Sequence, residues 1–230
     1  MVPALSVRGT ATPGAVLFDL DGVVTDTAGR HSAAWRRLAL ELRWRFDEDL
    51  HDALRGVGRL DALAMLARRN GLSLPADEAT RLADRKNGYY VESLAGLRPA
   101  DILPGVERLL DELEAAGIRT ALASASRNAP AIIAMLGIAR RFTAVVDPDG
   151  MPGKPHPAIF LEAARLVGSE PSLCVGIEDA QAGVDAIKAA GMKAVAVGGD
   201  LRGADAAVGD TEGLTLGLLM SLFAAREGGP

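Results

Sequence analysis

The sequence predicts an α/β protein with a Rossmann-like parallel-sheet core and a helical cap domain inserted after the first strand. Two observations lead to this fold. From about residue 104 to residue 198, short apolar runs alternate with helical patterns. One further apolar run, at residues 15–18, stands apart from the others, and a long helical stretch separates it from them. Alternating strands and helices are typical of a parallel sheet that is covered by helices on both faces.

The first strand is predicted at the run AVLF, residues 15–18. This run is short and apolar, and Asp19 and Gly22 follow it. An apolar run without polar alternation suits a strand that is buried on both faces and ends in a loop. Asp19 is therefore expected at the carboxyl end of the strand.

The stretch from residue 31 to about residue 97 has a helical pattern and no convincing strand. Its first helix places Trp35, Leu38, Ala39 and Leu42 on one face and Arg36, Arg37 and Glu41 on the other. About 65 residues are too many for a connection between elements, which usually has about 4–6. We therefore predict a cap domain at residues 30–96, a core domain at residues 15–29 and 97–230, and a flexible N-terminal tail at residues 1–14. The two connections, near residues 25–30 and 93–101, are expected to act together as a hinge.

The rest of the core is predicted as repeated strand–helix units. Helices are expected at VERLLDELEAAG, APAIIAMLG, PAIFLEAARLVG and AQAGVDAIKAAG, and strands at RTALAS, TAVVD, LCVGIED and KAVAVG. Each of these helices ends at a glycine suited to a helix C-terminus.

Composition excludes several classes of protein. With 49% hydrophobic residues, a chain of 230 residues can bury a large core. The net charge of −5 comes without a basic stripe, so nucleic acid is not expected as a partner. No apolar run reaches the ~18 residues of a membrane span, and the first fourteen residues lack the apolar core of a signal peptide. The single cysteine, Cys174, is expected as a buried strand thiol, and the cytoplasm is the expected location.

Polar residues gather at the ends of the predicted strands. In an open parallel sheet, ligands bind beyond the carboxyl ends of the strands. Four such positions carry side chains that can bind a ligand or take part in catalysis: Asp19 and Asp21; Ser124 and Ser126; Lys154; and Glu178 and Asp179. They are expected to converge on one edge of the sheet.

The chemistry of this set favours phosphoryl transfer. Crowded carboxylates repel one another unless a cation lies between them, and an all-oxygen set favours a hard ion such as Mg²⁺ together with phosphate oxygens. A lysine and hydroxyl groups suit the phosphate. Asp19 is then a candidate nucleophile, Asp21 a candidate proton donor and acceptor, and Gly22 allows the backbone to turn sharply.

Each of these features also has a simpler interpretation. An Asp-x-Asp pair is commonly a solvated turn, the two serines can cap the following helix, and a lysine is commonly on the surface. Glu178 and Asp179 can cap the helix that begins near Ala180. The occurrence of all four features at successive strand ends favours a functional site.

The ordered motifs DLDG, SAS, GKPHP and IEDA resemble those of the haloacid dehalogenase superfamily of phosphotransferases, with a helical cap inserted after the first motif. Longer segments, FDLDGVVTDTAGRH, RGVGR, RKNGYY, ALASASRNAP and GIEDAQAGVDAIKAAG, resemble the β-phosphoglucomutase family of that superfamily. The resemblance extends from residue 16 to about residue 212.

The resemblance implies roles for the core residues. Asp19 would be the nucleophile that forms an aspartyl phosphate, and Asp21 the general acid and base. Mg²⁺ would be held by the Asp19 carboxylate, the Asp21 backbone carbonyl and Asp179, with Glu178 as a ligand or close beside them. Ser124 and Lys154 would bind the phosphoryl group that is transferred.

It also implies roles for cap and hinge residues. Arg59 would bind the second, non-transferring phosphate, with help from Ser126, Arg127 and Asn128. Thr27 and His31 would lie at the hinge, and His31 and Lys86 would position the substrate and Asp21. Taken singly, Arg59, His31 and Lys86 are more simply interpreted as ordinary helix residues. Arg127 departs from the family, which commonly has lysine there, and the loop DPDGMPGKP does not map closely onto the family pattern.

The implied reaction interconverts β-D-glucose 1-phosphate and D-glucose 6-phosphate. It proceeds through the aspartyl phosphate and β-glucose 1,6-bisphosphate, which also serves as activator. The expected partner is a small phosphosugar, and the expected state is a monomer. Two alternatives remain: a capped phosphatase acting on a sugar phosphate or phosphoglycolate, and a non-catalytic phosphosugar sensor. Free phosphate release would reveal the former, and labelling of Asp19 would exclude the latter.

Overall fold

In the computed structural model, which describes residues 12–54, 56–199 and 201–224, six parallel strands form one sheet. The strands are β1 (Ala15–Phe18), β2 (Arg119–Leu122), β3 (Ala144–Val145), β4 (Cys174–Glu178), β5 (Lys193–Val197) and β6 (Ala206–Val208). Their order is β3-β2-β1-β4-β5-β6, so β1 is central and pairs with β2 and β4. The chain builds the sheet outward from β1 in both directions, which places the topological switch point, where ligands bind in such folds, between β1 and β4.

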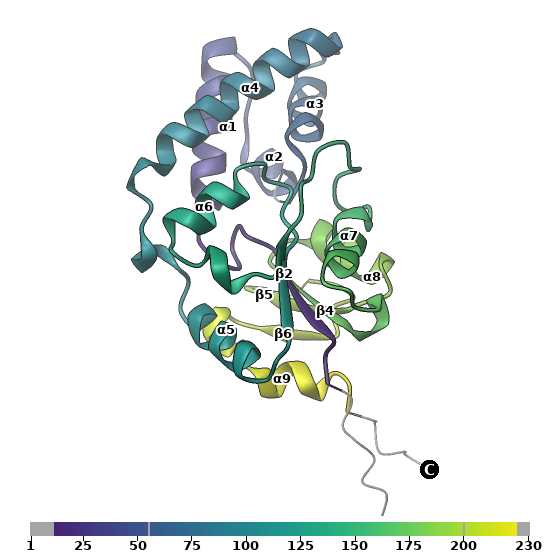
Figure 1. Cartoon of the computed structure of the whole chain (residues 1–230). Helices are drawn as coiled ribbons and strands as arrows, with labels where there is room; N and C mark the ends of the chain where they lie inside the picture. Colours follow the sequence, from purple (N-terminus) through teal and green to yellow (C-terminus); the bar gives the residue numbers. More distant parts are fainter. Residues whose placement is uncertain (1–11, 55, 200, 225–230) are drawn as a thin grey trace, which may run out of the picture.

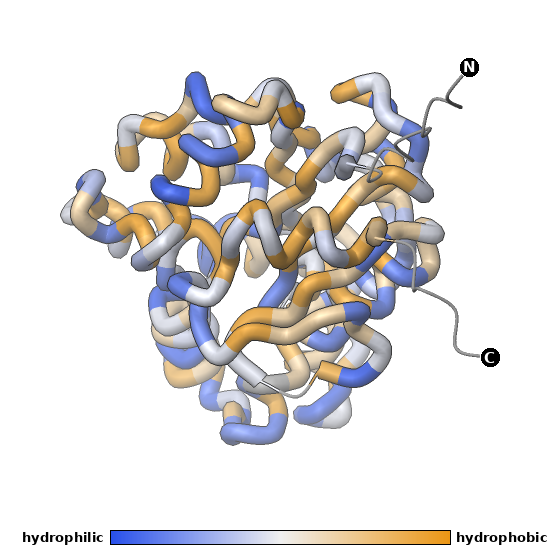
Figure 2. The backbone as a smooth tube through the Cα atoms, turned by 90° about the horizontal axis from the view of Figure 1, so that it is seen from below, coloured by the Kyte–Doolittle hydropathy of each residue, from blue (hydrophilic) through white to orange (hydrophobic). Residues whose placement is uncertain are grey.

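Helices cover both faces of the sheet, as predicted. On one face lie α5 (Val106–Ala115), α6 (Ala129–Met135) and α9 (Leu216–Ser221), and on the other α7 (Ala158–Leu166) and α8 (Gln181–Ala189) (Figure 1). Val16 and Phe18 pack into the first layer, and Ala15 and Leu17 into the second. All four residues of β1 are fully buried, which explains why the run is apolar without alternation. Viewed from below, apolar segments cross the middle of the molecule and hydrophilic turns lie around them (Figure 2).

The inserted segment forms a helical group beyond the carboxyl ends of the strands (Figure 1). It consists of α1 (Ala28–Leu42), α2 (Glu48–Ala53), α3 (Arg59–Arg69) and α4 (Ala76–Ser93), and it has a hydrophobic core of its own. On α1, Trp35, Leu38 and Ala39 are buried as expected, whereas Leu42 is only partly buried. The helix begins at Ala28, two residues before the predicted boundary of the cap.

The two connections between the helical group and the core lie side by side. Thr25 forms an antiparallel bridge with Ile102, and its Oγ1 donates a hydrogen bond to the backbone oxygen of Asp101 at 2.8 Å. The backbone nitrogen of Leu103 donates to the oxygen of Val24 at 2.9 Å. The predicted hinge segments are thus in contact, and their movement stays a prediction.

Some details differ from the expectations. Strand β3 has two residues where TAVVD was expected, and β6 and α9 were not predicted, because both are short and lack a clear pattern. Of the expected tail, residues 1–11 lie outside the described part of the chain, and Gly14 donates a backbone hydrogen bond to the oxygen of Leu173 at 2.8 Å. Five 3₁₀ helices complete the described chain: Leu94–Gly96, Pro99–Asp101, Ala139–Arg141, Pro171–Leu173 and Thr211–Gly213.

Other expectations are confirmed. The glycines that follow α5, α6, α7 and α8 all have positive φ angles, as the predicted helix ends require. Cys174 is buried at the start of β4. Within the described residues, no helix has both the length and the apolar character needed to cross a membrane.

Candidate active site

The carboxyl ends of β1 and β4 bring together two carboxylates and a lysine. Lys154 Nζ lies 2.5 Å from Oδ1 of Asp19 and 2.6 Å from Oε1 of Glu178. Asp19 follows β1, Glu178 ends β4, and Lys154 reaches them from the loop before α7. All three side chains are buried, so Lys154 is not a surface lysine.

Burial and crowding set the charges in this cluster. Burial raises the pKa of Asp19 well above its usual range; Lys154 opposes this rise, and the nearby carboxylates Glu178, Asp21 and Asp179 add to it. Burial alone would lower the pKa of Lys154, but the charges and hydrogen bonds of Asp19 and Glu178 raise it above its ordinary value. Lys154 therefore stays cationic. A single lysine does not balance all of the surrounding carboxylates, so the site favours a further cation.

The donor set fits a hard metal ion. Carboxylate oxygens of Asp19, Glu178 and Asp179 lie within 4.8 Å of one another. Oxygen ligands of this kind suit Mg²⁺. A Cβ at Gly22 would come within 1.9 Å of Asp179 Oδ2, and Gly22 has a φ of 82°. Only glycine therefore lets the turn after Asp21 approach the Asp179 carboxylate this closely.

Glycine is also needed behind Glu178. A Cβ at Gly183 would lie 1.8 Å from Glu178 Oε1, so α8 leaves room for this carboxylate against its first turn. Glu178 Oε2 accepts hydrogen bonds from the backbone nitrogens of Asp179 and Ala180 at 2.8 and 2.9 Å. The helix-capping interpretation of Glu178 is thus partly correct, because one oxygen binds backbone and the other binds Lys154. Gly183 was not singled out from the sequence, although a glycine inside a helical pattern is a signal of close approach.

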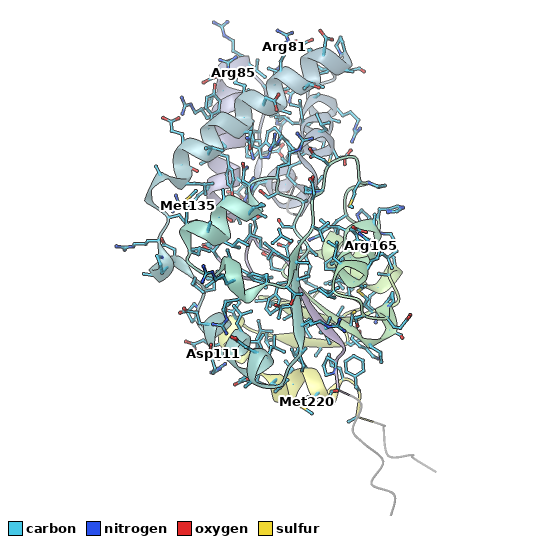
Figure 3. The ribbon with its side chains drawn as sticks, in the orientation of Figure 1. Arg81, Arg85, Asp111, Met135, Arg165 and Met220 are labelled. Carbon is cyan, nitrogen blue, oxygen red and sulfur yellow. The ribbon has the colours of Figure 1, made fainter. Side chains whose placement is uncertain are left out.

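A chain of polar contacts leads from the helical group to Asp21. Thr27 Oγ1 donates a hydrogen bond to Asp21 Oδ1, and His31 Nε2 lies 3.7 Å from the same oxygen. The other ring nitrogen of His31, Nδ1, is 2.8 Å from Lys86 Nζ. Lys86 is buried on α4, the helix whose Arg81 and Arg85 project outward (Figure 3). Lys86 is therefore a buried residue in contact with His31 and is not an ordinary exposed residue of its helix.

The pKa of His31 sets its charge, and its contact with Lys86 favours one tautomer. Burial lowers the pKa of His31 to about 4 and that of Lys86 to about 7. His31 is consequently neutral at neutral pH. Because Lys86 can donate to Nδ1, the neutral ring keeps its hydrogen on Nε2, which faces Asp21. His31 can thus present a hydrogen-bond donor to the Asp21 carboxylate.

Arg59 points toward the core from the first turn of α3. Its Nη2 donates to Oδ1 of Asn87 at 2.9 Å, and its Nη1 lies 3.4 Å from Oδ1 of Asp84. Asn128 Nδ2, from the core, donates to the same oxygen of Asn87 at 2.8 Å. Asn87 therefore joins Arg59 to Asn128 across the two parts of the molecule. Sequence reasoning missed Asn87, although the quoted segment RKNGYY contains it.

The residues of the segment SASRN, 124–128, line two different cavities. Ser124 and Ser126 line the same cavity as Asp19, and Ser124 Oγ accepts a hydrogen bond from the backbone nitrogen of Ser126 at 3.1 Å. Ser126 Oγ accepts a hydrogen bond from the backbone nitrogen of Asn128, the N-cap residue of α6, at 3.3 Å, so the helix-capping interpretation is partly correct for Ser126. Arg127 lies elsewhere: it is half-exposed, forms an ion pair with Asp149 and lines a neighbouring cavity.

One open cavity joins most of these groups. Core residues contribute one wall, and α1, α3, α4 and the α2 region contribute the other. Its lining includes Asp19, Asp21, Ser124, Ser126, Asn128 and Asp179 from the core, and His31, Arg59, Lys86, Asn87, Trp35, Phe46 and His51 from the helical group. The last three were not predicted, and they add aromatic surface of the kind that packs against a sugar ring. Thr27 and Glu178 are not among its lining residues, and Lys154 lines the neighbouring cavity. Thr27 contacts Asp21, and Lys154 contacts Asp19 and Glu178.

Comparison with known proteins agrees with this geometry. The model of the haloacid dehalogenase-like hydrolase family matches residues 13–191. The chain is 45% identical over 210 residues to the β-phosphoglucomutase of Bacillus subtilis (strain 168), which covers 89% of this chain and 93% of that protein. It is 30% identical over 184 residues to the fructose-1-phosphate phosphatase YqaB of Escherichia coli (strain K12), covering 79% and 95% of the two chains. Among solved structures, the β-phosphoglucomutase of Clostridium difficile superposes with a TM-score of 0.89 at 37% identity, covering 92% and 97%.

Proposed function

The chain belongs to the haloacid dehalogenase-like hydrolase family, and on this basis we propose that it is a phosphomutase that interconverts β-D-glucose 1-phosphate and D-glucose 6-phosphate. One observation carries the proposal: a single cavity has Asp19 at one side and the Arg59–Asn87–Asn128 group at the other. A mutase needs two phosphate pockets that can exchange occupants, and this cavity offers a candidate for each. The similarity to two β-phosphoglucomutases supports the choice of substrate.

Asp19 is the proposed nucleophile. One of its oxygens forms a bond to the phosphorus of the bound bisphosphate while the bond from phosphorus to the sugar oxygen breaks, which leaves an aspartyl phosphate and a sugar monophosphate. Lys154 holds the carboxylate and the incoming phosphoryl oxygens, and the Ser124 hydroxyl donates to the latter. Held by Asp19, Asp179 and the Asp21 backbone carbonyl, with Glu178 beside them, Mg²⁺ would offset the repulsion between these carboxylates and the phosphate.

Asp21 is the proposed general acid and base. It gives a proton to the sugar oxygen that leaves phosphorus and takes one from the hydroxyl that attacks the aspartyl phosphate. Thr27 holds its carboxylate by a hydrogen bond, and His31 Nε2 faces the same oxygen from 3.7 Å. Lys86 fixes the orientation of the His31 ring.

The helical group is proposed to bind the other phosphate. Arg59, Ser126 and Asn128 bind it while Asp19 reacts, and the closed cap excludes water from the aspartyl phosphate. The β-glucose 1,6-bisphosphate intermediate then turns so that its phosphates exchange pockets. Arg127 lies outside the cavity and would have to leave Asp149 to join this pocket.

The same proposal includes the setting in which the enzyme works. It acts as a cytoplasmic monomer on a small phosphosugar in carbohydrate metabolism, with no role for nucleic acid or membranes. A net charge of −5 supports the absence of a nucleic-acid partner.

A direct assay tests the function. Purified protein is incubated with Mg²⁺, a trace of β-glucose 1,6-bisphosphate and either anomer of glucose 1-phosphate, and glucose 6-phosphate and free phosphate are followed together. We expect glucose 6-phosphate from the β anomer with little free phosphate. Failure to form glucose 6-phosphate would reject the proposal.

A capped phosphatase is the second candidate. The similarity to a fructose-1-phosphate phosphatase favours it, since the core residues serve both reactions. In the same assay it would release phosphate in proportion to the substrate consumed, without forming glucose 6-phosphate.

A further inference from the structure

Tyr90 is a buried residue that packs behind His31, a lining residue of the cavity, and it has no role in the reaction described so far. It lies on α4, one turn after Lys86, and its side chain is fully buried. Its ring stacks on that of His31, with centroids 3.8 Å apart and an angle of 29° between the planes. Tyr90 therefore packs directly against the histidine that faces Asp21.

The hydroxyl of Tyr90 lacks a hydrogen-bond partner. Within the described residues, two buried side-chain polar atoms are without one, namely Tyr90 Oη and His31 Nε2. Buried polar groups are nearly always paired, because leaving one unpaired is costly. Both exceptions belong to the stacked pair beside Asp21. A phenylalanine would fill the same space without this penalty, so packing does not explain the hydroxyl.

The groups near the hydroxyl indicate what it can bind. Burial is the main reason that the pKa of Tyr90 rises above its ordinary value; the charge of Asp21 adds to the rise, and the Thr27 hydroxyl opposes it. The phenol therefore keeps its proton and can act as a donor. Thr27 already donates its own proton to Asp21, so its oxygen is free to accept. The Thr27 hydroxyl lies near enough to affect the pKa of Tyr90, yet Tyr90 Oη makes no hydrogen bond of acceptable geometry in the resting protein.

We propose that Tyr90 is a positioning residue for Asp21: during turnover its hydroxyl donates to Thr27 Oγ1, which in turn donates to the Asp21 carboxylate. This rests on the proposed function, in which Asp21 transfers the proton. Hydrogen bonds in such a chain strengthen one another. This row of hydrogen bonds also links α4 of the helical group to the loop after β1 that carries Asp21. Asp21 would therefore be held firmly only when α4 is in place.

Two isosteric variants on adjacent residues test the proposal. Tyr90→Phe removes the hydroxyl and keeps the ring, and Tyr89→Phe is the matched control. The Tyr89 hydroxyl donates to Glu41 at 2.6 Å and accepts from Arg85 at 2.8 Å on the outer side of the cap. For Tyr90→Phe we expect kcat to fall roughly three- to ten-fold, the worth of one neutral hydrogen bond, with little change in KM. Tyr89→Phe should keep the wild-type kcat. An unchanged kcat in Tyr90→Phe overturns the proposal.

Two further measurements separate positioning from a structural role. The unfolding temperature of Tyr90→Phe should equal or exceed that of the wild type, because the lost hydroxyl has no partner in the resting protein. In a Thr27→Val background, adding Tyr90→Phe should change kcat by less than about two-fold, since the hydroxyl that connects Tyr90 to Asp21 is already absent. Effects that multiply in the double variant, or a drop in unfolding temperature that accounts for the lost activity, overturn the proposal.

Hydrolysis of acetyl phosphate keeps this test independent of the mutase assignment. In that reaction Asp21 takes a proton from the attacking water, so Tyr90→Phe should slow it by a similar factor. A wild-type protein that hydrolyses acetyl phosphate but forms no glucose 6-phosphate would reject the proposed function, and the Tyr90 proposal would then stand or fall on the hydrolysis rate of the variant.

Discussion

Replacing Arg59 with alanine should separate the mutase reaction from the underlying phosphoryl chemistry. Arg59 is proposed to hold the phosphate that does not react, while Asp19, Asp21 and Lys154 carry out the transfer. A charge-assisted hydrogen bond to phosphate contributes about 1.5–3 kcal/mol, which corresponds to a roughly 10–150-fold loss of the closed complex. We therefore expect glucose 6-phosphate formation to fall by that factor in Arg59→Ala.

The folded state should tolerate this change. In the resting protein, Arg59 bonds to Asn87 and approaches Asp84, whose side chain is 65% exposed. The ion pair with this exposed partner contributes about 0–1 kcal/mol and the hydrogen bond to Asn87 about 0.5–1.5 kcal/mol, so the free energy of unfolding should fall by no more than about 2.5 kcal/mol. Asn87 also keeps its hydrogen bond from Asn128. A large loss of activity therefore cannot be attributed to unfolding.

The assay compares two reactions in the same variants. Glucose 6-phosphate formation requires both phosphate pockets, whereas acetyl phosphate hydrolysis requires only the Asp19 side. Arg85→Ala is the control, because Arg85 pairs with Glu41 at 2.6 Å and projects away from the cavity (Figure 3). We expect Arg59→Ala to depress the mutase reaction far more than hydrolysis, and Arg85→Ala to depress neither. If Arg59→Ala lowers both reactions equally, or neither, Arg59 does not bind the second phosphate and the phosphatase becomes the better assignment.

Four other outcomes follow from the same site. Asp19→Asn should abolish turnover, because no neighbouring side chain can accept the phosphoryl group; activity within ten-fold of wild type would reject Asp19 as the nucleophile. Asp21→Ala should reduce turnover roughly 10²–10⁴-fold, the usual effect of a positioned acid or base. An unchanged rate of glucose 6-phosphate formation would make Asp21 a structural turn residue. A chelator should stop the reaction until Mg²⁺ is restored, since the carboxylates cannot accommodate a phosphate without a cation, and full activity in excess chelator would contradict the metal site. Lys86, whose pKa is lowered by burial to about 7 from 10.5, binds fewer protons in the folded than in the unfolded protein between these values. Stability should therefore fall as pH decreases from about 10 to 7, and Lys86→Met should remove that contribution; equal pH dependence of the two unfolding temperatures would contradict the lowered pKa.

Much of the core and of its chemistry was predictable because the signals are local. The buried strand at residues 15–18 is apolar without alternation, and its carboxyl end carries Asp19. Strand β4 is buried in the same way and pairs in parallel with β1, so Glu178 at its end lies at the same edge as Asp19. Strand β6 escaped prediction because its three residues are partly exposed and carry little apolar pattern.

The contacts across the cavity depend on how the helical group docks on the core. Asn87 bridges Arg59 and Asn128, and Arg127 turns away to Asp149, although Arg127 and Asn128 are neighbours in the chain. No local pattern encodes such contacts, because they join side chains that are far apart in the sequence. Asn87 and Asn128, for example, are 41 residues apart.

The sequence by itself determined the kinds of residue at the strand ends, and hence the class of chemistry. Only the tertiary structure decided their charge states and the surroundings of Asp21. The pKa of Lys86 falls to about 7 because burial removes its amine from water, and the ring of Tyr90 stacks on His31 while its hydroxyl has no hydrogen-bond partner. Burial and orientation of this kind arise from the whole packed molecule, because desolvation depends on every group that excludes water from a side chain.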